Sequence, residues 1–528
     1  MDQGSARAGV NWIRLAPLVI VAIGVVAYAN SFQGTLVFDD VYTIRNVQTP
    51  WGDRIVGVFP KTPRAIADAT FVLNYAVAGA RAADYHAVNL IFHIASALLL
   101  YGLVRRTATG LGWLDERSGA LVAAAAASLW ISHPLTTAAV TYVSQRYESL
   151  MSMFYLAALY AVMRGNFVAR GQWAWYAMAV LACLMGMGTK EVMVTAPVAI
   201  ALYDWTFLAR GSIRAMIRRR WPLYLGLAAT WIALGFLMHI RTEVERADFY
   251  RQTGVSAVAY AATELLATAR YLRLAFWPDG LCFDYGWPVV SDNAAGLLGA
   301  GALMTALIVV AAIGTYRHRL WSYPLSFFFL VLAPTGLVAR PDPIMEHRAY
   351  LALAGVVVFS VGLLFHLLRR GGRRFAQWEE RGNLLCLVLA AALVALNVGR
   401  TVLRNADYST DERLWRSTVA QAPLNPRAKV GLAATLLRAG RTGEAKAVLE
   451  YALHQLVDRP ADRYPYRLTV EAMARNDLGV AWYQETDYAK AETQFREALR
   501  LAPADAGMIQ NLERTLERKR ETSNLPVP

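Results

Sequence analysis

The chain has 528 residues, of which 56% are hydrophobic and 17% charged, whereas an average soluble protein has roughly 25% charged residues. Its net charge of +14 would suit nucleic acid, but most arginines before residue 400 lie in short clusters between long apolar stretches, where they set membrane topology. The composition therefore favours a polytopic membrane protein and excludes a soluble enzyme or a nucleic-acid-binding domain as the main part of the chain.

The apolar stretches predict about eleven helices long enough to cross ~30 Å of hydrocarbon. The first stretch has no small-residue cleavage pattern after it, so we interpret it as a retained helix rather than a cleaved signal. Residues 257–277 carry three charged side chains and are expected to be interfacial or re-entrant. The predicted spans are residues 12–31, 86–104, 118–132, 148–163, 172–189, 192–208, 222–239, 294–314, 322–338, 350–368 and 384–400.

Arginine clusters predict the orientation of these spans. They fall in every second connection, and the positive-inside rule places such connections in the cytoplasm. An odd number of spans then puts the N-terminus in the cytoplasm and the region after residue 400 in the periplasm of a bacterial inner membrane. An error of one helix would move that region to the cytoplasm. Cysteines are few and scattered, so no disulfide framework or zinc spacing is present.

The C-terminal region has the residue spacing of tetratricopeptide repeats, which are pairs of antiparallel helices. Residues 472–505 carry Gly479, Ala491, Phe495 and Pro503 at the expected positions, and residues 426–459 form an earlier unit. Helices through Trp415 and over residues 511–520 are expected to flank these units. Such arrays bind peptides along a concave face. The predicted fold class is thus all-α, with a transmembrane domain over residues 1–404 and a periplasmic repeat domain over residues 405–528.

Polar residues occur where hydrocarbon would make them costly, and most of them map to one face of the predicted membrane domain. Asp39 and Asp40 directly follow the first span; alone, such a pair is most often a solvated turn. His86, Asn89 and His93 share one face of the second span, where a hydrogen-bonding seam between helices is the alternative to a ligand site. The other candidates at this face are Arg64, His133, Arg146, Lys190, Glu191, Arg340, Glu346 and Arg348.

The ordered set of motifs resembles a known family. The run Val37-Phe38-Asp39-Asp40, then Arg64, Tyr85-His86, His133-Pro134, Lys190-Glu191, Arg348-Ala349-Tyr350-Leu351 and a tetratricopeptide tail is similar to the transmembrane and tetratricopeptide-repeat O-mannosyltransferases and their bacterial relatives. Those proteins belong to the GT-C glycosyltransferase superfamily. The resemblance implies an integral-membrane enzyme that transfers one sugar, with mannose a candidate, from a polyprenyl-phosphate donor to a protein hydroxyl on the non-cytoplasmic face.

The resemblance also implies roles for the candidate residues. Asp39 or Asp40 is the expected general base, because an acceptor hydroxyl is a poor nucleophile until a carboxylate takes its proton. Arg146, Lys190, Arg340 and Arg348 are candidates for binding the leaving phosphate. Arg348 is favoured among them, because a guanidinium pairs with phosphate through two parallel hydrogen bonds. His86 or His133 is expected to orient sugar hydroxyls or the phosphate; the donor-site set also includes Asn89, His93, Arg64, Glu191 and Glu346.

The chain departs from this family after His133-Pro134. Relatives commonly continue that motif with a histidine and a glutamate, whereas this chain has Thr136 and Ala138. The missing acidic ligand leaves dependence on a divalent cation open, so no cofactor is firmly predicted and no metal ligands are assigned. A diverged or inactive member is an alternative that the intact acidic pair disfavours.

Two further hypotheses stay open at the level of sequence. The same donor chemistry could act on a lipid or an envelope glycan, although the repeat tail favours a protein acceptor. A non-catalytic scaffold or transporter could instead use the repeats to recruit partners; the chain lacks the convincing internal repeat that transporters often show. The expected partners are the lipid bilayer, a polyprenyl-phosphate-linked sugar and a protein or peptide acceptor, with no nucleic acid.

Overall fold

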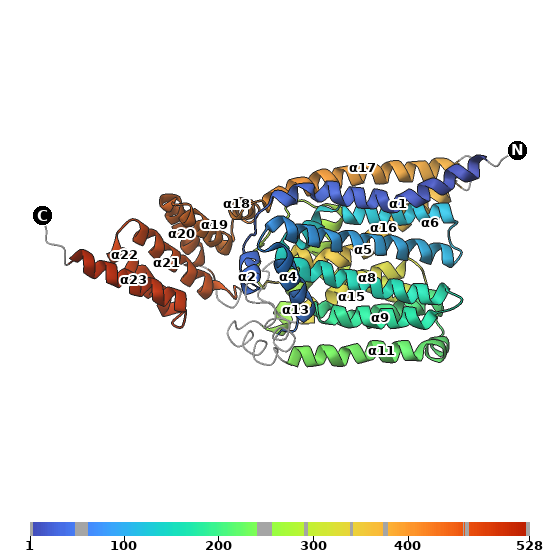
Figure 1. Ribbon diagram of the computed structural model, residues 1–528, viewed down its shortest axis with the longest axis horizontal. Helices are drawn as coiled ribbons and strands as arrows, with labels where there is room; N and C mark the ends of the chain where they lie inside the picture. Colours follow the sequence, from blue (N-terminus) through green and yellow to red (C-terminus); the bar gives the residue numbers. More distant parts are fainter. Residues whose placement is uncertain are drawn as a thin grey trace.

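The computed structural model describes residues 4–47, 62–239, 256–289, 294–337, 342–372, 378–457, 459 and 464–523. Over these residues the elements are helices and short helical turns joined by loops. A long bundle of roughly parallel helices carries a smaller stack of helices at one end (Figure 1). The all-α architecture with a polytopic membrane bundle and a C-terminal helical-repeat domain, predicted from the sequence, is confirmed.

Each predicted span corresponds to a helix of the bundle. These helices are α1 (Gly4–Tyr28), α5 (Ala82–Gly110), α6 (Glu116–Ile131), α8 (Arg146–Phe167), α9 (Gln172–Met187), α10 (Ala196–Tyr203), α11 (Ile213–His239), α14 (Ala294–Tyr316), α15 (Ser322–Leu337), α16 (Ala349–Gly372) and α17 (Trp378–Asp407). Within the described ranges, 7 helices are long and apolar enough to cross a membrane, and up to 8 if α6 and the segment Pro134–Val140, bent by 53° from it, form one span. Helices α9 and α15 are apolar but shorter.

Small residues explain how tightly the centre of the bundle packs. The alanine-rich helix α6 is buried along most of its length, and a Cβ at Gly102 of α5 would lie 2.7 Å from the ring of Tyr160 on α8. Small side chains let the backbones of membrane helices approach closely. By contrast, α14 has large apolar side chains such as Leu298, Ile308 and Val309 exposed, as expected for a helix at the lipid-facing surface of the bundle.

The two ends of the bundle differ in the elements they carry. The short helices α2 (Asp39–Asn46) and α4 (Ala65–Ala78) and the helix α13 (Ala257–Phe276) lie at the end next to the repeat domain, while the N-terminus lies at the opposite end (Figure 1). The connections α5–α6, α8–α9 and α10–α11, which carry arginine clusters, also lie at the N-terminal end. The N-terminus and the repeats are therefore at opposite ends, as an odd number of spans requires; which side of the membrane each end faces stays a prediction.

Residues 133–145, which connect α6 to α8, are a packed segment. They form the turn η2 (Pro134–Thr136), the short helix α7 (Thr137–Val140) and the turn η3 (Val143–Gln145), and nearly all of them are buried. Burial requires internal partners for their polar groups, and Thr141 finds one by donating a hydrogen bond to Asn405 on α17 at 2.7 Å. This segment thus forms part of the packed floor beneath α2.

The C-terminal domain consists of two helical hairpins with flanking helices. Its elements are α18 (Asp411–Gln421), α19 (Pro426–Arg438), α20 (Thr442–Val457), α21 (Arg467–Gln484), α22 (Tyr488–Leu501) and α23 (Ala506–Ser523). Gly431 and Gly479 permit the close helix contacts typical of the repeat, because a Cβ there would lie 2.4 Å from Trp415 and 2.7 Å from Phe495. Helix α21 begins at Arg467, earlier than the repeat unit predicted from residue 472.

The repeat domain packs directly against the segment that contains the acidic pair. Val37 and Tyr142 of the membrane domain share one hydrophobic core with Leu414 and Trp415 of α18. The ring of Phe38 meets that of Trp415 at 5.4 Å, edge to face. The C-terminal domain is therefore part of the structure that positions Asp39 and Asp40.

Candidate functional site

Asp39 and Asp40 begin helix α2 in different environments. Asp40 is completely buried, and its Oδ1 accepts hydrogen bonds from the backbone N–H and the hydroxyl of Ser144, both at 2.6 Å. Its Oδ2 accepts a hydrogen bond from the N–H of Val37 at 3.2 Å. Asp39 is exposed. Of the two carboxylates, Asp39 is the one that an incoming substrate can reach without a rearrangement of the chain.

The residue before the pair has a strained backbone. Phe38 has φ 48° and ψ −116°, a conformation that a bulky side chain rarely adopts. Its N–H donates a hydrogen bond to Oδ1 of Asp411 in the repeat domain at 3.0 Å, and its ring contacts Phe283 and Trp415. Such strain persists only where surrounding contacts hold it, and it is frequent at functional sites. The repeat domain thus helps to hold the acidic pair in place.

Desolvation changes the acidity of both carboxyls, fully for the buried Asp40 and in part for Asp39. Desolvation raises the pKa of Asp40 to about 7, although the hydrogen bonds from Ser144 and Val37 oppose this change. Desolvation also raises the pKa of Asp39; the Tyr142 hydroxyl lowers it, Asp342 raises it and the positive charge of Arg427 lowers it. Because the charges of Asp342 and Arg427 affect this pKa, Asp39 lies within electrostatic reach of the junction between the two domains.

A cavity of about 50 Å³ lies at that junction, lined from both domains. Arg427 of α19 crosses it: the guanidinium donates one hydrogen bond to Asp284 at 2.5 Å and another to Asp342 at 2.6 Å. Its guanidinium also stacks over the ring of Tyr466 at 4.8 Å. Arg427 was not predicted as a site residue, because an arginine in a repeat helix carries no local sign of what it faces.

Arg146 is fully buried beside Asp40 and forms no ion pair within the described residues. Its guanidinium donates hydrogen bonds to Asn89 Oδ1 and Asn74 Oδ1, both at 2.7 Å, and to the carbonyl oxygens of Thr70 and Tyr85. Because these partners are neutral, its positive charge is not cancelled locally. The site therefore contains a fixed positive charge next to the acidic pair, although the hydrogen-bonding capacity of this side chain is largely used.

His86 is buried, and neither of its ring nitrogens has a hydrogen-bond partner among the residues that the structure describes. Its Nε2 would lie 3.5 Å from a Cβ at Gly34, so the ring faces the segment that leads into the acidic pair. A buried polar group usually has a partner. Both ring nitrogens of His86 thus lack a protein partner among the described residues, and its role in orienting the donor stays a prediction.

His93, His133 and Asn89 use their polar atoms inside the bundle. His93 lies 2.7 Å from the Tyr350 hydroxyl through Nδ1 and 2.9 Å from the Ile131 carbonyl through Nε2. His133 accepts a hydrogen bond from the N–H of Leu135, and its Nε2 lies 3.2 Å from the Ala275 carbonyl. Asn89 donates to the carbonyls of Val140 and Val143. For His93 and Asn89 these contacts favour the alternative interpretation of a hydrogen-bonding seam between helices. For all three residues they lend no support to a donor-binding role.

Arg64, Lys190 and Glu191 form a second group at the same end of the bundle. Arg64 pairs with Glu191 at 2.9 Å, and Lys190 pairs with the buried Glu148. The Arg64 guanidinium lies 5.0 Å from the ring centroid of Tyr147. The structure thus brings Arg64 and Glu191 together, as their common assignment to one site suggested, but each cation already has a carboxylate partner.

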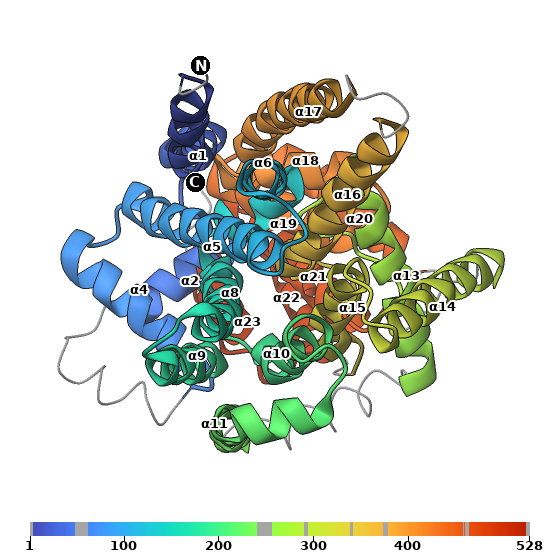
Figure 2. The same ribbon diagram turned by 90° about the vertical axis from the view of Figure 1, so that its right-hand side faces the viewer.

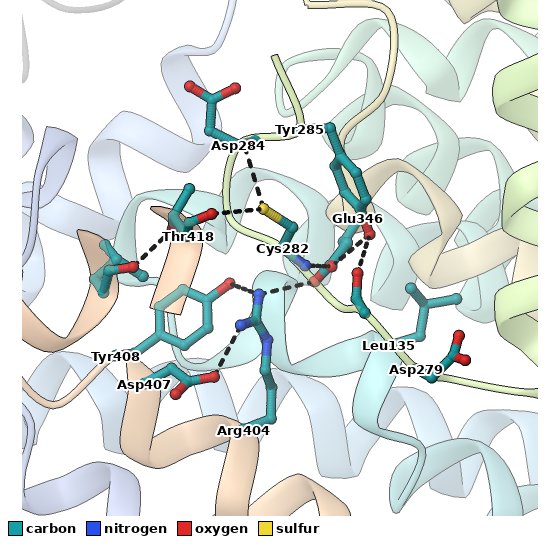
Figure 3. Close-up of polar contacts among 12 residues, drawn as sticks. Leu135, Asp279, Cys282, Asp284, Tyr285, Glu346, Arg404, Asp407, Tyr408 and Thr418 are labelled. Atoms are coloured by element: carbon teal, nitrogen blue, oxygen red, sulfur yellow. Dashed lines mark hydrogen bonds and ion pairs between the residues drawn. The ribbon is translucent and has the colours of Figure 1, made fainter. Parts of the chain in front are cut away.

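Glu346 is the centre of a third buried network, shown in Figure 3. It accepts hydrogen bonds from the Cys282 N–H and from the Tyr285 hydroxyl at 2.9 Å, and its other oxygen pairs with Arg404 at 3.3 Å. Arg404 also pairs with Asp407 at 2.9 Å. Arg404 was missed because it ends the last apolar stretch, where an arginine is most simply read as a boundary residue.

Arg348 lies behind one wall of the junction cavity. It donates a hydrogen bond to the carbonyl of Pro343, which lines the cavity, at 3.0 Å, and its ion pair with Glu264 of α13 is long, at 3.5 Å. Glu264, one of the charged residues of the helix predicted to be interfacial, is thus the ion-pair partner of Arg348, the residue favoured for binding the phosphate. Arg340 lies outside the described residues.

Within the described ranges, no group of three or more His, Cys, Asp or Glu side chains could hold a metal ion. The carboxylates near Asp39 pair instead with cations, as Asp284 and Asp342 do with Arg427 and Glu346 does with Arg404. The arrangement thus provides an accessible carboxylate, several buried guanidinium groups and an unpartnered histidine. This combination can accept a proton and stabilise an anionic leaving group.

Comparison with known proteins gives relatives of one class. The chain is 23% identical over 455 residues to the protein O-mannosyl-transferase F38B6.6 of Caenorhabditis elegans, covering 81% of this chain and 61% of that protein. It is 23% identical over 491 residues to the protein O-mannosyl-transferase TMTC4 of Homo sapiens, covering 80% and 64%. These relatives confirm the resemblance seen in the motifs. The chain spans about three fifths of the length of these curated relatives.

Other comparisons add less. No protein-family model matches the chain. The crystal structure of ArnT from Cupriavidus metallidurans bound to undecaprenyl phosphate aligns with 92% of this chain and 80% of that chain, at 13% sequence identity and a TM-score of 0.38. So distant a structural likeness implies nothing about the ligands or the mechanism of this protein.

Proposed function

We propose that this protein is an inverting glycosyltransferase of the GT-C type that transfers one sugar, with mannose the candidate, from a polyprenyl-phosphate-linked donor to a protein hydroxyl. The reaction takes place at the end of the bundle that carries the repeat domain, on the non-cytoplasmic side of the membrane. The observation that carries this proposal is the exposed carboxylate of Asp39 at a junction with buried guanidinium groups. The O-mannosyl-transferase relatives support the reaction class.

Asp39 acts as the general base. Its carboxylate takes the proton of the acceptor hydroxyl while the hydroxyl oxygen bonds to the anomeric carbon of the sugar. The bond from that carbon to the phosphate oxygen breaks, and its electron pair leaves with the lipid phosphate. Asp40, held by Ser144 and Val37, positions the start of α2 rather than contacting the substrate.

Cations replace an acid at the leaving group, because a phosphate leaves without needing a proton. Arg348 is our proposed ligand of that phosphate, since its ion pair with Glu264 is long and it lies behind the cavity wall. Arg146 contributes its uncancelled charge at a distance, and His86 orients the donor head group. Such preorganised charges stabilise a transition state strongly in a water-poor site.

The first test compares two isosteric substitutions at this end of the bundle. Asp39→Asn should reduce transfer from a polyprenyl-phosphate sugar by ~10²–10⁴-fold, the range of general base catalysis, with little change in thermal stability. Asp84→Asn, which removes a carboxylate paired with Arg81 near the surface, is the matched control and should keep its activity. Full transfer by Asp39→Asn in membranes supplied with donor would refute the proposal.

The second test concerns the acceptor. Arg427→Gln removes both ion pairs across the junction cavity and should raise the KM for an acceptor peptide while leaving the KM for the donor unchanged. Arg500→Gln, on the exposed face of α22, removes a surface ion pair of the same domain and should change neither value. If Arg427→Gln altered only the KM for the donor, this side of the junction would belong to the donor site, and the assignment to the acceptor would be wrong.

A further inference from the structure

The first turns of α11 run across the bundle rather than along it. Helical geometry breaks at Arg220, which has φ −135° and ψ 17°. Pro222 accounts for the break, because its ring carries no N–H and would collide with the carbonyl four residues earlier. Figure 2 shows the segment before the break lying crosswise at the N-terminal end of the bundle, and the rest of α11 seen end-on. Residues Ile213–Arg219 thus form a helical segment in the plane expected for the membrane surface.

This crosswise segment is amphipathic. Ile213 and Ile217 of the segment, and Trp221 just after the break, follow one another at four-residue spacing and are 59%, 58% and 58% exposed. Four arginines of this corner, Arg210, Arg214, Arg218 and Arg219, are also exposed and form no ion pair with any described residue. An amphipathic helix with exposed apolar and basic side chains is typical of a segment that lies in the membrane interface.

An apolar groove lies between this segment and α10. It has a volume of about 390 Å³, within the ~300–1,000 Å³ range of small-molecule sites. Val198, Leu202 and Trp205 line it from the α10 side, and Ile213, Ile217 and Tyr224 line it from α11. The groove thus offers an apolar surface directly beside unpaired positive charges.

A buried polar network fixes this corner of the molecule. Arg220 pairs with Asp204 at 2.8 Å and donates a hydrogen bond to Asn166 at 2.6 Å. The hydroxyl of Tyr224, which lines the groove, donates a hydrogen bond to Asp204 at 2.5 Å. Because these partners come from α8, η5 (Asp204–Leu208) and α11, they hold the crosswise segment at a set distance from α10.

We propose that this groove binds an anionic phospholipid, with an acyl chain between α10 and the crosswise segment and the phosphate against Arg214 and Arg218. Charge complementarity identifies this occupant, since Arg214 and Arg218, which have no acidic partner among the described residues, directly follow the groove-lining Ile213 and Ile217. Clusters of four or more basic residues on an interfacial amphipathic helix typically bind acidic lipid head groups. The site lies at the opposite end of the bundle from Asp39 and is independent of the proposed catalysis.

Native mass spectrometry of the full chain, titrated with phosphatidylglycerol or phosphatidylcholine, tests this site. The wild-type protein should bind phosphatidylglycerol more tightly than phosphatidylcholine. The pair Arg214→Gln and Arg218→Gln should weaken phosphatidylglycerol binding by on the order of tenfold or more. Ala201→Phe, which fills the groove, should weaken binding of both lipids.

The matched control is the pair Arg106→Gln and Arg117→Gln, which removes two exposed arginines from the same end of the bundle, away from the groove. This control should bind phosphatidylglycerol as the wild type does. An equal loss in the control would show general electrostatic attraction and overturn the proposal. Equal affinity of the wild type for both lipids, or full binding by Ala201→Phe, would also overturn it. Thermal unfolding of each variant without lipid identifies a folding defect, and Ala201→Phe carries the test if the arginine variant does not fold.

Discussion

The two ends of the helix bundle differ in the burial and pairing of their charged side chains. At the end under the repeat domain, several carboxylates are buried in ion pairs with cations, as Glu346 is with Arg404 and Glu148 with Lys190. At the N-terminal end most arginines are exposed, and Asp204 with Arg220 is the buried pair that holds a corner. A buried charge is costly unless it is paired, whereas water and salt screen an exposed one. The first end therefore holds charged side chains in fixed geometry, whereas the second leaves most of its described arginines exposed.

The largest effect on stability should come from breaking a buried pair under the repeat domain. Arg404→Met leaves the buried Glu346 without its cation and should cost ~3–5 kcal/mol of unfolding free energy, because the carboxylate remains desolvated. Chemical denaturation in detergent measures this loss. The double variant with Glu346→Gln should recover part of it; a loss below ~1 kcal/mol in the single variant would mean that the network is weaker than its burial implies.

The next largest difference between the two ends should be in how stability depends on pH. Between pH ~4 and ~7 the folded state keeps a proton on Asp40 that the unfolded chain releases, because burial raises the pKa of this carboxyl to about 7. Stability should therefore fall as the pH rises through this window, by up to ~4 kcal/mol. Thermal unfolding as a function of pH measures the slope, and Asp40→Asn should reduce it; Asp39, whose pKa desolvation also raises, keeps its own contribution. An unchanged slope in that variant would contradict the assignment.

Asp115, at the N-terminal end, should change stability with pH in the opposite direction to Asp40. Desolvation would raise its pKa, but hydrogen bonds from Ser118 and Arg117 outweigh it, so the pKa is lowered. Its contribution to stability is therefore present at neutral pH and should be lost as the pH falls below the ordinary range of an aspartate. Asp115→Asn should flatten the acid limb of the stability curve and leave the limb between pH ~4 and ~7 unchanged.

The smallest effect should come from an exposed pair at the N-terminal end. Arg105 and Glu116 lie 2.8 Å apart with the glutamate largely exposed, so Arg105→Gln should change stability by less than ~1 kcal/mol, and less still in high salt. Chemical denaturation at two salt concentrations measures this difference. A loss as large as that of Arg404→Met would remove the contrast between the two ends.

Much of the fold was predictable because its signals are local. Apolar stretches mark the spans, and each of them is a helix; Gly479 and Phe495 mark a repeat because neighbouring helices meet at that spacing. The acidic pair was identified by its place after the first span. Local pattern did not predict that residues 133–145 are buried, because their polar groups find partners on distant helices, as Thr141 does with Asn405.

The sequence alone thus determined the membrane class, the helix order, the repeat tail and the set of candidate residues, because hydropathy and repeat spacing are properties of neighbouring residues. Only the tertiary structure decided that Asp40 is buried while Asp39 is exposed, and that His93 and His133 form hydrogen bonds inside the bundle. It also decided that Arg404 and Arg427 form ion pairs at the end of the bundle that carries the repeat domain. Those outcomes depend on pairings between residues up to hundreds of positions apart, such as Phe38 with Asp411. Burial, which sets the cost and strength of each such pairing, exists only once the chain has folded.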